Sequence, residues 1–172
     1  MDNKLWEKAA AFHGHKCPGL AIGVRICQAA AKHLIIEPAF DEELVCVAEN
    51  DSCSADAVQA IFSCTFGKGN LIYHPTGKQA FSFYKRQTGE SARFVFSGEA
   101  GAMGRDEYLN YILTAPLEKL IEVKKTTLAL PEKARIFRPA TCQSCGEVTA
   151  EYYIRIQEGK MLCPDCFNEY DR

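Results

Sequence analysis

The chain has 172 residues, enough for one compact domain with a small second unit, and 47% are hydrophobic while 24% are charged. A formal net charge of −2 excludes the strong positive field that typifies nucleic-acid-binding and anionic-membrane-binding proteins. No apolar stretch approaches the ~20 residues of a membrane helix and the N-terminus lacks a signal-peptide core, so we expect a cytoplasmic protein without membrane association.

The first part of the chain predicts two helices joined by a loop of metal-binding side chains. Residues 5–12 have helical spacing, and a second apolar face follows over residues 20–34. The loop reads FHGHKCPG and contains His13, His15 and Cys17. A proline at the first helical position makes Cys17 the N-cap, where the helix dipole favours thiolate over thiol.

A second cysteine lies at another predicted helix start. Residues 43–49, ELVCVAE, predict a strand, and the NDSCSAD segment that follows has helix-capping chemistry around Cys53. If the two helix starts converge, Cys17, Cys53 and the nearby histidines, His15 above all, form a site for a transition metal or an activated thiolate. The alternative is that both cysteines fill helix tops and the histidines belong to a turn.

The middle of the chain alternates irregularly between strand and helix patterns. Residues 70–89 predict a hairpin turning at Pro75–Gly77, and a further strand follows near residue 92. Lys68 between two glycines marks either a helix stop or a contact for an anionic ligand group. A helical pattern over 104–128 is broken by Pro116. These patterns predict an α+β fold around a mixed or antiparallel sheet.

The C-terminal part contains two C-x2-C pairs separated by 17 residues. Each pair places two thiolates on one tight turn, so together they predict a tetrahedral Zn²⁺ site, with a rubredoxin-type iron centre as the alternative. A predicted strand at 152–156, a turn and a returning strand indicate a zinc-ribbon or treble-clef finger that ends in a short helix. The four ligands are Cys142, Cys145, Cys163 and Cys166.

The finger is predicted to be structural and separate from the core. Prolines bracket a connecting segment at 129–140, which predicts a core domain over 1–138 and a finger over 139–172. The finger carries three basic against six acidic residues, the opposite of the balance that phosphate binding requires. Nucleic-acid binding is therefore not favoured.

The chain resembles the FmdE family, which is named for a component of formylmethanofuran dehydrogenase. The resemblance lies in FHGHKCPGLAIGVR, AENDSCSADAVQ, CTFGKGNLIYHPTGKQAF and the two C-x2-C pairs, within residues 12–81 and 142–166. It implies an α+β core, a treble-clef zinc finger, a homodimer, and association with the molybdenum- or tungsten-dependent enzyme that reduces CO₂ onto methanofuran. Pterin-metal chemistry is expected in other components of that system.

Three functions follow from these patterns. The first is a metal-binding accessory protein with a core metal (Zn²⁺, Ni²⁺ or Fe²⁺) held by His15, Cys17 and Cys53 beside the structural zinc. The second is an enzyme in which Cys17 acts as nucleophile or metal-bound thiolate, His15 as acid or base, and Asp51 orients it. The third, a nucleic-acid-binding regulator, is opposed by the acidic finger.

Overall fold

The computed structural model describes residues 3–170, which divide into two compact units at the bond between Ala134 and Arg135. The first unit is an α+β domain, as predicted. Its elements in chain order are α1 (Asn3–His13), α2 (Pro18–Leu34), β1 (Leu44–Ala48), α3 (Cys53–Phe62), β2 (Leu71–Tyr73), β3 (Ala80–Lys85), β4 (Ser91–Phe96), α4 (Arg105–Thr114), α5 (Leu117–Leu120) and β5 (Ile121–Lys124).

The five strands form one mixed sheet in the order β2-β1-β3-β4-β5. β1 pairs with β2 in parallel through the α3 crossover, and every other pair is antiparallel. The predicted hairpin over 70–89 is therefore wrong, because β1 lies between β2 and β3. The hairpin of this sheet joins β3 to β4 instead, where Phe83 pairs with Ala92.

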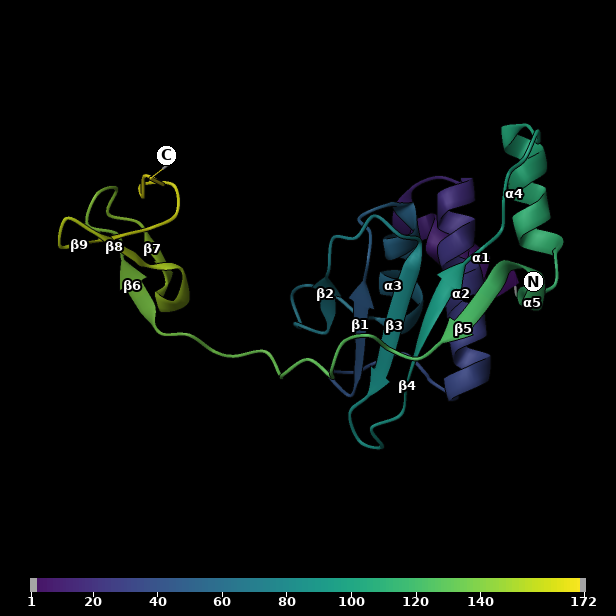
Figure 1. The fold of residues 1–172 in the computed structure, drawn as a ribbon, viewed down its shortest axis with the longest axis horizontal. Coiled ribbons are helices and arrows are strands. Elements are labelled where there is room, and N and C mark those ends of the chain that lie inside the picture. Colours follow the sequence, from purple (N-terminus) through teal and green to yellow (C-terminus); the bar gives the residue numbers. More distant parts are fainter. Residues whose placement is uncertain (1–2, 171–172) are drawn as a thin grey trace. The chain divides into compact units, whose positions relative to one another are not determined.

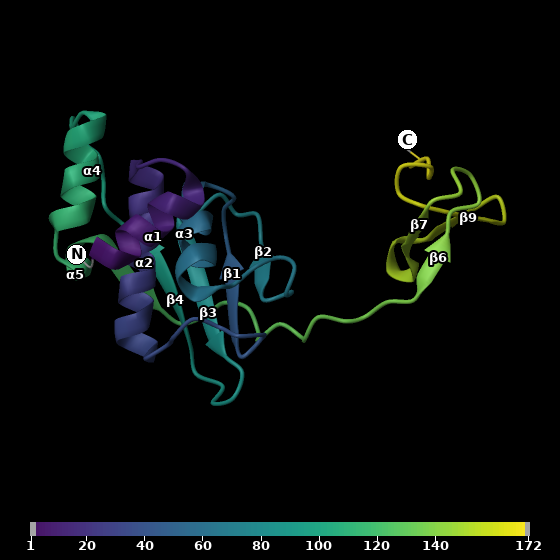
Figure 2. The same cartoon turned by 180° about the vertical axis from the view of Figure 1, so that it is seen from behind.

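Helices α1, α2 and α3 cover one face of the sheet (Figures 1 and 2). Side chains alternate along each strand, so every second residue of β3 and β4 points at the helices. Phe81, Phe83 and Phe94 lie there fully buried, and Phe83 meets Phe94 edge-on at a centroid distance of 5.9 Å. Cys27 of α2 and Cys46 of β1 are also fully buried in this core, as predicted.

The opposite face of the sheet is crossed by the segment that follows β5 (Figure 1). That face carries a small buried cluster of Val45, Val47 and Tyr84. The Tyr84 hydroxyl donates to the Leu128 carbonyl at 2.9 Å, which fastens the crossing segment to β3. We call residues 125–134 the strap.

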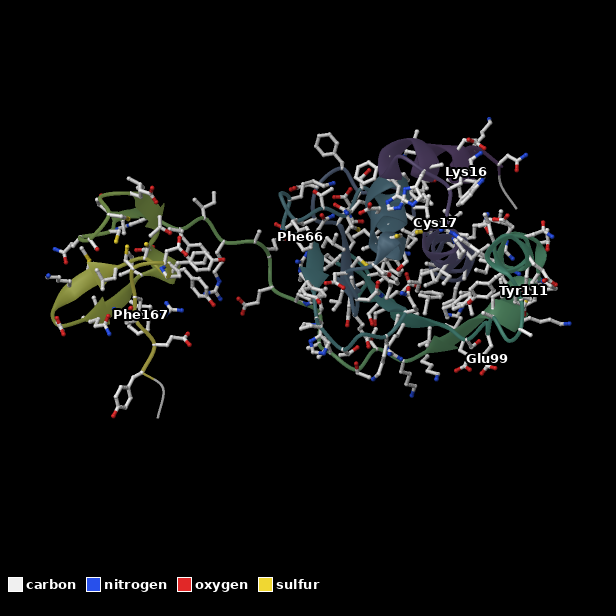
Figure 3. The ribbon with its side chains drawn as sticks, turned by 90° about the horizontal axis from the view of Figure 1, so that it is seen from above. Lys16, Cys17, Phe66, Glu99, Tyr111 and Phe167 are labelled. Carbon is white, nitrogen blue, oxygen red and sulfur yellow. The ribbon has the colours of Figure 1, made fainter. Side chains whose placement is uncertain are left out.

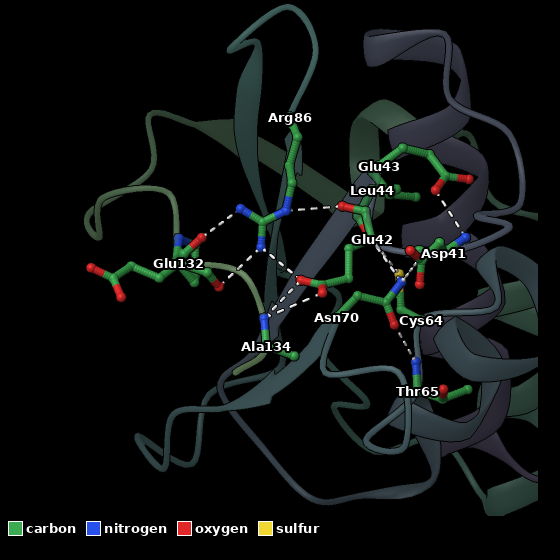
Figure 4. A network of polar contacts seen from close by, with 11 residues as sticks. Asp41, Glu42, Glu43, Leu44, Cys64, Thr65, Asn70, Arg86, Glu132 and Ala134 are labelled. Carbon is green, nitrogen blue, oxygen red and sulfur yellow. Dashed lines mark hydrogen bonds and ion pairs between the residues drawn. The ribbon is translucent and has the colours of Figure 1, made fainter. Parts of the chain in front are cut away.

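A second set of bonds holds the end of the strap (Figure 4). Arg86 donates to the carbonyls of Pro131 at 2.7 Å and Glu132 at 3.0 Å. The same guanidinium pairs with Glu42, whose carboxylate accepts the backbone N–H of Ala134 at 3.1 Å. The side chains of Arg86 and Glu42 are only 12% and 13% exposed, so this is a largely buried anchor.

The predicted helical pattern over 104–128 is correct for α4 and α5, which meet at Pro116, and wrong beyond them. Residues 121–124 form the edge strand β5. Val123 pairs with Phe94 of β4, so the backbone ladder outweighs local helix propensity here.

The second unit consists of two short hairpins. β6 (Pro139–Thr141) pairs with β7 (Val148–Ala150), and β8 (Arg155–Gln157) pairs with β9 (Lys160–Leu162). A 3₁₀ turn (Glu151–Tyr153) occupies the start of the strand predicted at 152–156. The predicted terminal helix is wrong for the described residues, which form a turn and coil from Cys163 to Tyr170. The unit is zinc-ribbon-like.

Among residues 3–170, no helix has both the length and the apolar character needed to cross a membrane.

Candidate metal centres

Two groups of side chains in the described residues could each hold a metal ion. One consists of the four finger cysteines, and the other of His13, Cys17 and Cys53. Within each group, all the ligand atoms lie within 4.8 Å of one another. The finger cysteines lie in the second unit. His13, Cys17 and Cys53 lie among the helices of the first unit.

The finger group is built by the two C-x2-C turns. Gly146, with φ +77°, lets the first turn close, and its N–H donates to the Cys142 carbonyl at 3.0 Å. Cys142 Sγ accepts the N–H of Cys163 at 3.3 Å, while Cys145 Sγ lies 3.9 Å from Cys163 Sγ. The backbone N–H groups of Cys145 and Cys163 lower the pKa of Cys142 to about 6. A thiolate at neutral pH is the form that binds a metal.

The core group begins with Cys17 at the N-cap of α2, as predicted. Its backbone is extended (φ −149°, ψ 162°), and Sγ accepts the N–H of Leu20 at 3.3 Å. Pro18 at the first helical position has no N–H to satisfy. Lys16, next in the same loop, is exposed whereas Cys17 is 5% exposed; both are labelled in Figure 3.

Cys53 is the first residue of α3, so both thiols lie at helix starts. The starts converge because α2 and α3 pack through two glycines. A Cβ on Gly19 would lie 3.2 Å from Cys53 Cβ, and one on Gly23 would lie 2.3 Å from the Ser54 carbonyl oxygen. Any larger side chain at Gly23 would force the helices apart. Glycines four residues apart on a helix were the sequence signal for this convergence, and the sequence reasoning missed it.

The third member of the core group is His13, the last residue of α1. Its Nε2 lies 3.8 Å from Cys17 Sγ, and its Nδ1 lies 2.7 Å from Asp56 Oδ2. His15 is exposed and packs its ring against that of His13, with centroids 4.4 Å apart. The structure thus brings Cys17, Cys53 and His13 together, and His15 adds no atom to this group. A role for His15 stays a prediction.

A hydrogen-bond network holds the loop that presents Cys53. Asn50 Oδ1 accepts from the hydroxyl of Ser52 at 2.7 Å and lies 3.1 Å from that of Ser54. The Gln79 side chain donates to the Ser52 hydroxyl and accepts from that of Ser54. Because Ser52 and Ser54 flank Cys53, these bonds restrict where its thiol can lie.

Burial raises the pKa of Cys53, and the neighbouring Cys17 thiol raises it further. Two thiolates side by side repel each other, so holding both in the thiolate form without a cation costs free energy. A divalent cation removes that penalty, because it replaces the protons of both thiols. Two thiolates and an imidazole are a donor set that suits Zn²⁺, Ni²⁺ or Fe²⁺.

Two other predicted site residues contribute no ligand atom to this group. Asp51 is exposed and lines a cavity of about 160 Å³ with Asn50, Asp56 and Tyr73, rather than orienting a histidine. Lys68 donates to the carbonyls of Ala39 at 2.9 Å and Phe40 at 3.4 Å, so its ammonium is bonded within the fold. The predicted helix stop at the two glycines is wrong, because α3 ends at Phe62 with Ser63 in the left-handed conformation, and of the two glycines Gly69 alone has a positive φ.

Comparison with known proteins gives a family, a curated relative and a solved structure. The model of a family described as "FmdE, Molybdenum formylmethanofuran dehydrogenase operon" matches residues 12–128. A protein of Archaeoglobus fulgidus named "Probable S-adenosyl-L-methionine-binding protein" is 28% identical over 97% of this chain. The chain covers only 53% of that protein, about half of its length.

The solved structure is that of a tungsten formylmethanofuran dehydrogenase FmdE-like protein from Syntrophus aciditrophicus. It aligns with a TM-score of 0.72 at 27% sequence identity. The alignment covers 95% of this chain and 90% of that one, so both units have a counterpart in it.

Proposed function

The chain belongs to the FmdE family, and from that membership we propose that it is a metal-binding accessory protein of a molybdenum- or tungsten-dependent system of one-carbon reduction. The observation that carries the proposal is the core group of His13, Cys17 and Cys53, which is separate from the finger cysteines. The protein then holds two metals with different tasks. The finger metal stabilises a small unit, and the core metal serves the partner system.

The donor sets support different metals in the two sites. Four thiolates on paired turns are the ligand set of closed structural zinc, so we assign Zn²⁺ to the finger. The core group offers three protein ligands, so a four-coordinate ion held there would keep one position for water, a substrate or a partner's ligand. An accessory protein that receives and passes on a metal needs such a position.

The same open position favours a second candidate, a stand-alone enzyme. Catalytic zinc sites typically have three protein ligands. In this alternative a metal bound by Cys17 and Cys53 supplies Lewis-acid chemistry, and the exposed His15 exchanges the proton at the mouth of the site. The two candidates differ in whether the purified protein turns over a substrate without a partner.

We further propose a cytoplasmic homodimer that associates with subunits of the molybdenum or tungsten enzyme. The nine cysteines are an odd number, none of them is in a disulfide, and six belong to the two proposed metal sites, which supports a reducing compartment. Exposed large hydrophobic side chains support association, and in the first unit they include Phe12, Ile35, Phe40 and Phe66. Sedimentation velocity at several concentrations measures the dimer directly.

The test of the two-metal proposal is metal content per chain, measured by inductively coupled plasma mass spectrometry. We expect about two equivalents in the full chain and about one in Cys17→Ala, with the finger metal retained. Cys145→Ser should show the reverse loss. Cys27→Ala is the matched control, because Cys27 is a fully buried thiol of α2 outside both groups and should keep both metals.

Loss of both metals in Cys17→Ala, or of neither, contradicts two independent sites. The accessory role is tested by adding the loaded protein to a formylmethanofuran dehydrogenase prepared without this component. We expect CO₂ reduction to rise with the wild-type chain and not with Cys17→Ala. An equal rise with both proteins contradicts a role for the core metal.

A further inference from the structure

We propose that Asp56, held by Gln59, positions His13 so that Nε2 is the atom presented to the core metal. This inference rests on the proposed function, because it concerns the same core site. It assigns a task to two residues of α3 that bind no metal themselves. Asp56 acts through another side chain and is therefore a positioning residue.

The first step is the contact between Asp56 and the imidazole. Asp56 Oδ2 lies 2.7 Å from His13 Nδ1, a distance at which a carboxylate accepts an N–H. A carboxylate has no proton to give, so this bond selects the tautomer with hydrogen on Nδ1. Nε2 then carries the lone pair, and it is Nε2 that lies 3.8 Å from Cys17 Sγ. Metal-bound histidines are commonly fixed by a carboxylate in this way.

The second step is the support of Asp56 itself. Gln59 Nε2 donates to Asp56 Oδ1 at 3.1 Å, so each carboxylate oxygen has its own partner. Cys53, Asp56 and Gln59 follow one another at intervals of three, which places them along one side of α3. One helix thus presents a thiol ligand and also orients the imidazole of a second ligand.

The third step explains the choice of histidine. The side chain of His13 is 11% exposed and that of Asp56 is 36% exposed, so the bond between them is partly shielded from water. His15 is exposed, and its described contact is ring packing against His13. That packing covers the His13 ring without contributing a ligand atom.

The experiment compares Asp56→Asn with Asp51→Asn in the full-length protein. Asp51 is the matched control because it lies at the same helix start and lines the same cavity, while the carboxylate that contacts His13 is that of Asp56. Core affinity for Zn²⁺ is measured by chelator competition, and Co²⁺ spectra report the core and the finger separately. We expect Asp56→Asn to weaken core binding about 10- to 100-fold and Asp51→Asn to leave it within about twofold.

The tautomer is read independently from the ¹⁵N shifts of the His13 ring. In the wild-type protein we expect a protonated Nδ1 both with and without Zn²⁺, and in Asp56→Asn a mixture of tautomers. Gln59→Leu should weaken core binding less than Asp56→Asn. The far-UV circular dichroism spectrum and the urea-unfolding midpoint of each variant show whether the first unit is folded, and an unchanged finger spectrum shows the same for the second unit.

The proposal is overturned if Nδ1 is the unprotonated nitrogen in the wild-type ring, whether or not a core metal binds. It is also overturned if Asp56→Asn and Asp51→Asn change core affinity equally. If the wild-type protein loads only its finger, the proposed function fails together with this inference. If the wild-type protein binds two metals and Asp56→Asn leaves the core affinity for Zn²⁺ unchanged, this inference alone is contradicted and the proposed function stands.

Discussion

At the scale of single residues, the site loop depends on a buried ion pair between distant segments. Arg93 of β4 donates to Glu49, the residue after β1, at 2.5 and 2.9 Å, and Thr76 adds a bond at 2.8 Å. The two charged side chains are 10% and 7% exposed. Glu49 directly precedes Asn50, the centre of the network around Cys53. The pair therefore fixes the strand end from which the site loop departs.

This pair predicts a pH-dependent stability. The hydrogen bond from Arg93 lowers the pKa of Glu49, although burial opposes it. A lowered folded-state pKa stabilises the protein above the unfolded value of ~4.3, and the contribution is lost as the pH falls through the folded-state pKa. We expect Glu49→Gln to lower the free energy of unfolding by about 3 kcal/mol at pH 7, because it leaves Arg93 buried without its counter-charge. Urea unfolding between pH 7 and pH 3 measures the difference.

The difference between Glu49→Gln and wild type should shrink toward pH 3. Glu122→Gln is the control, because Glu122 pairs with Lys124 at the surface with both side chains about half exposed. It should leave stability unchanged at every pH. If Glu49→Gln lowers the free energy of unfolding by the same amount at every pH from 7 to 3, the assigned link between the pKa of Glu49 and stability is contradicted.

At the scale of elements, the core site depends on how closely α2 and α3 approach. Gly23 lies against the backbone of the first turn of α3, where a Cβ would come within 2.7 Å of both Ser54 Cα and Ala57 Cβ. Those atoms belong to backbone and to a short side chain, so they cannot rotate out of the way. The distance between the two helices, and with it the separation of Cys17 and Cys53, is set by this contact.

Gly23→Ala should therefore weaken both the fold and the site. In an exposed helix the change would stabilise by ~1 kcal/mol through helix propensity. Here we expect a loss of about 1–3 kcal/mol from overpacking, together with weaker binding of Co²⁺ to the core as Cys53 moves. Urea unfolding and Co²⁺ titration measure the two effects. Gly67→Ala is the control, since its Cβ would meet nothing within 4 Å.

At the scale of the whole molecule, the first unit is closed on both faces of its sheet. Helices cover one face, and the strap crosses the other over Val45, Val47 and Tyr84 (Figure 1). Arg86 and Glu42 hold the strap to within one residue of the unit boundary (Figure 4). The strap therefore belongs to the fold of the first unit rather than to a linker.

Two truncations test this assignment. A chain that ends after Ala134 should keep the unfolding midpoint and the core metal of the full protein, because it retains the strap and its anchor. A chain that ends after Lys124 should have a free energy of unfolding lower by about 3 kcal/mol, since exposing Val45 and Val47 to water costs roughly 1.5 kcal/mol each. Thermal and urea unfolding measure both. Equal stability of the two truncated chains contradicts a structural role for the strap.

Features that depend on neighbouring residues could be predicted from the amino-acid sequence. Proline after Cys17 sets a helix start, the NDSCSAD segment predicts another at Cys53 although the N-cap Ser52 makes no side-chain capping bond, and paired C-x2-C turns bring finger thiols together. Each follows from backbone and side-chain preferences over a few positions. The α+β class follows from the same local patterns.

Features that join distant segments of the chain became visible in the packed structure and could not be predicted from local patterns. The turn at Pro75–Gly77 suggested a hairpin, but the parallel pairing of β2 with β1 is set by the α3 crossover. The contact between His13 and Asp56, which lie 43 residues apart in the sequence, likewise depends on how α1 packs against α3. Local propensity carries no information about such partners, because their contact depends on how whole helices and strands pack.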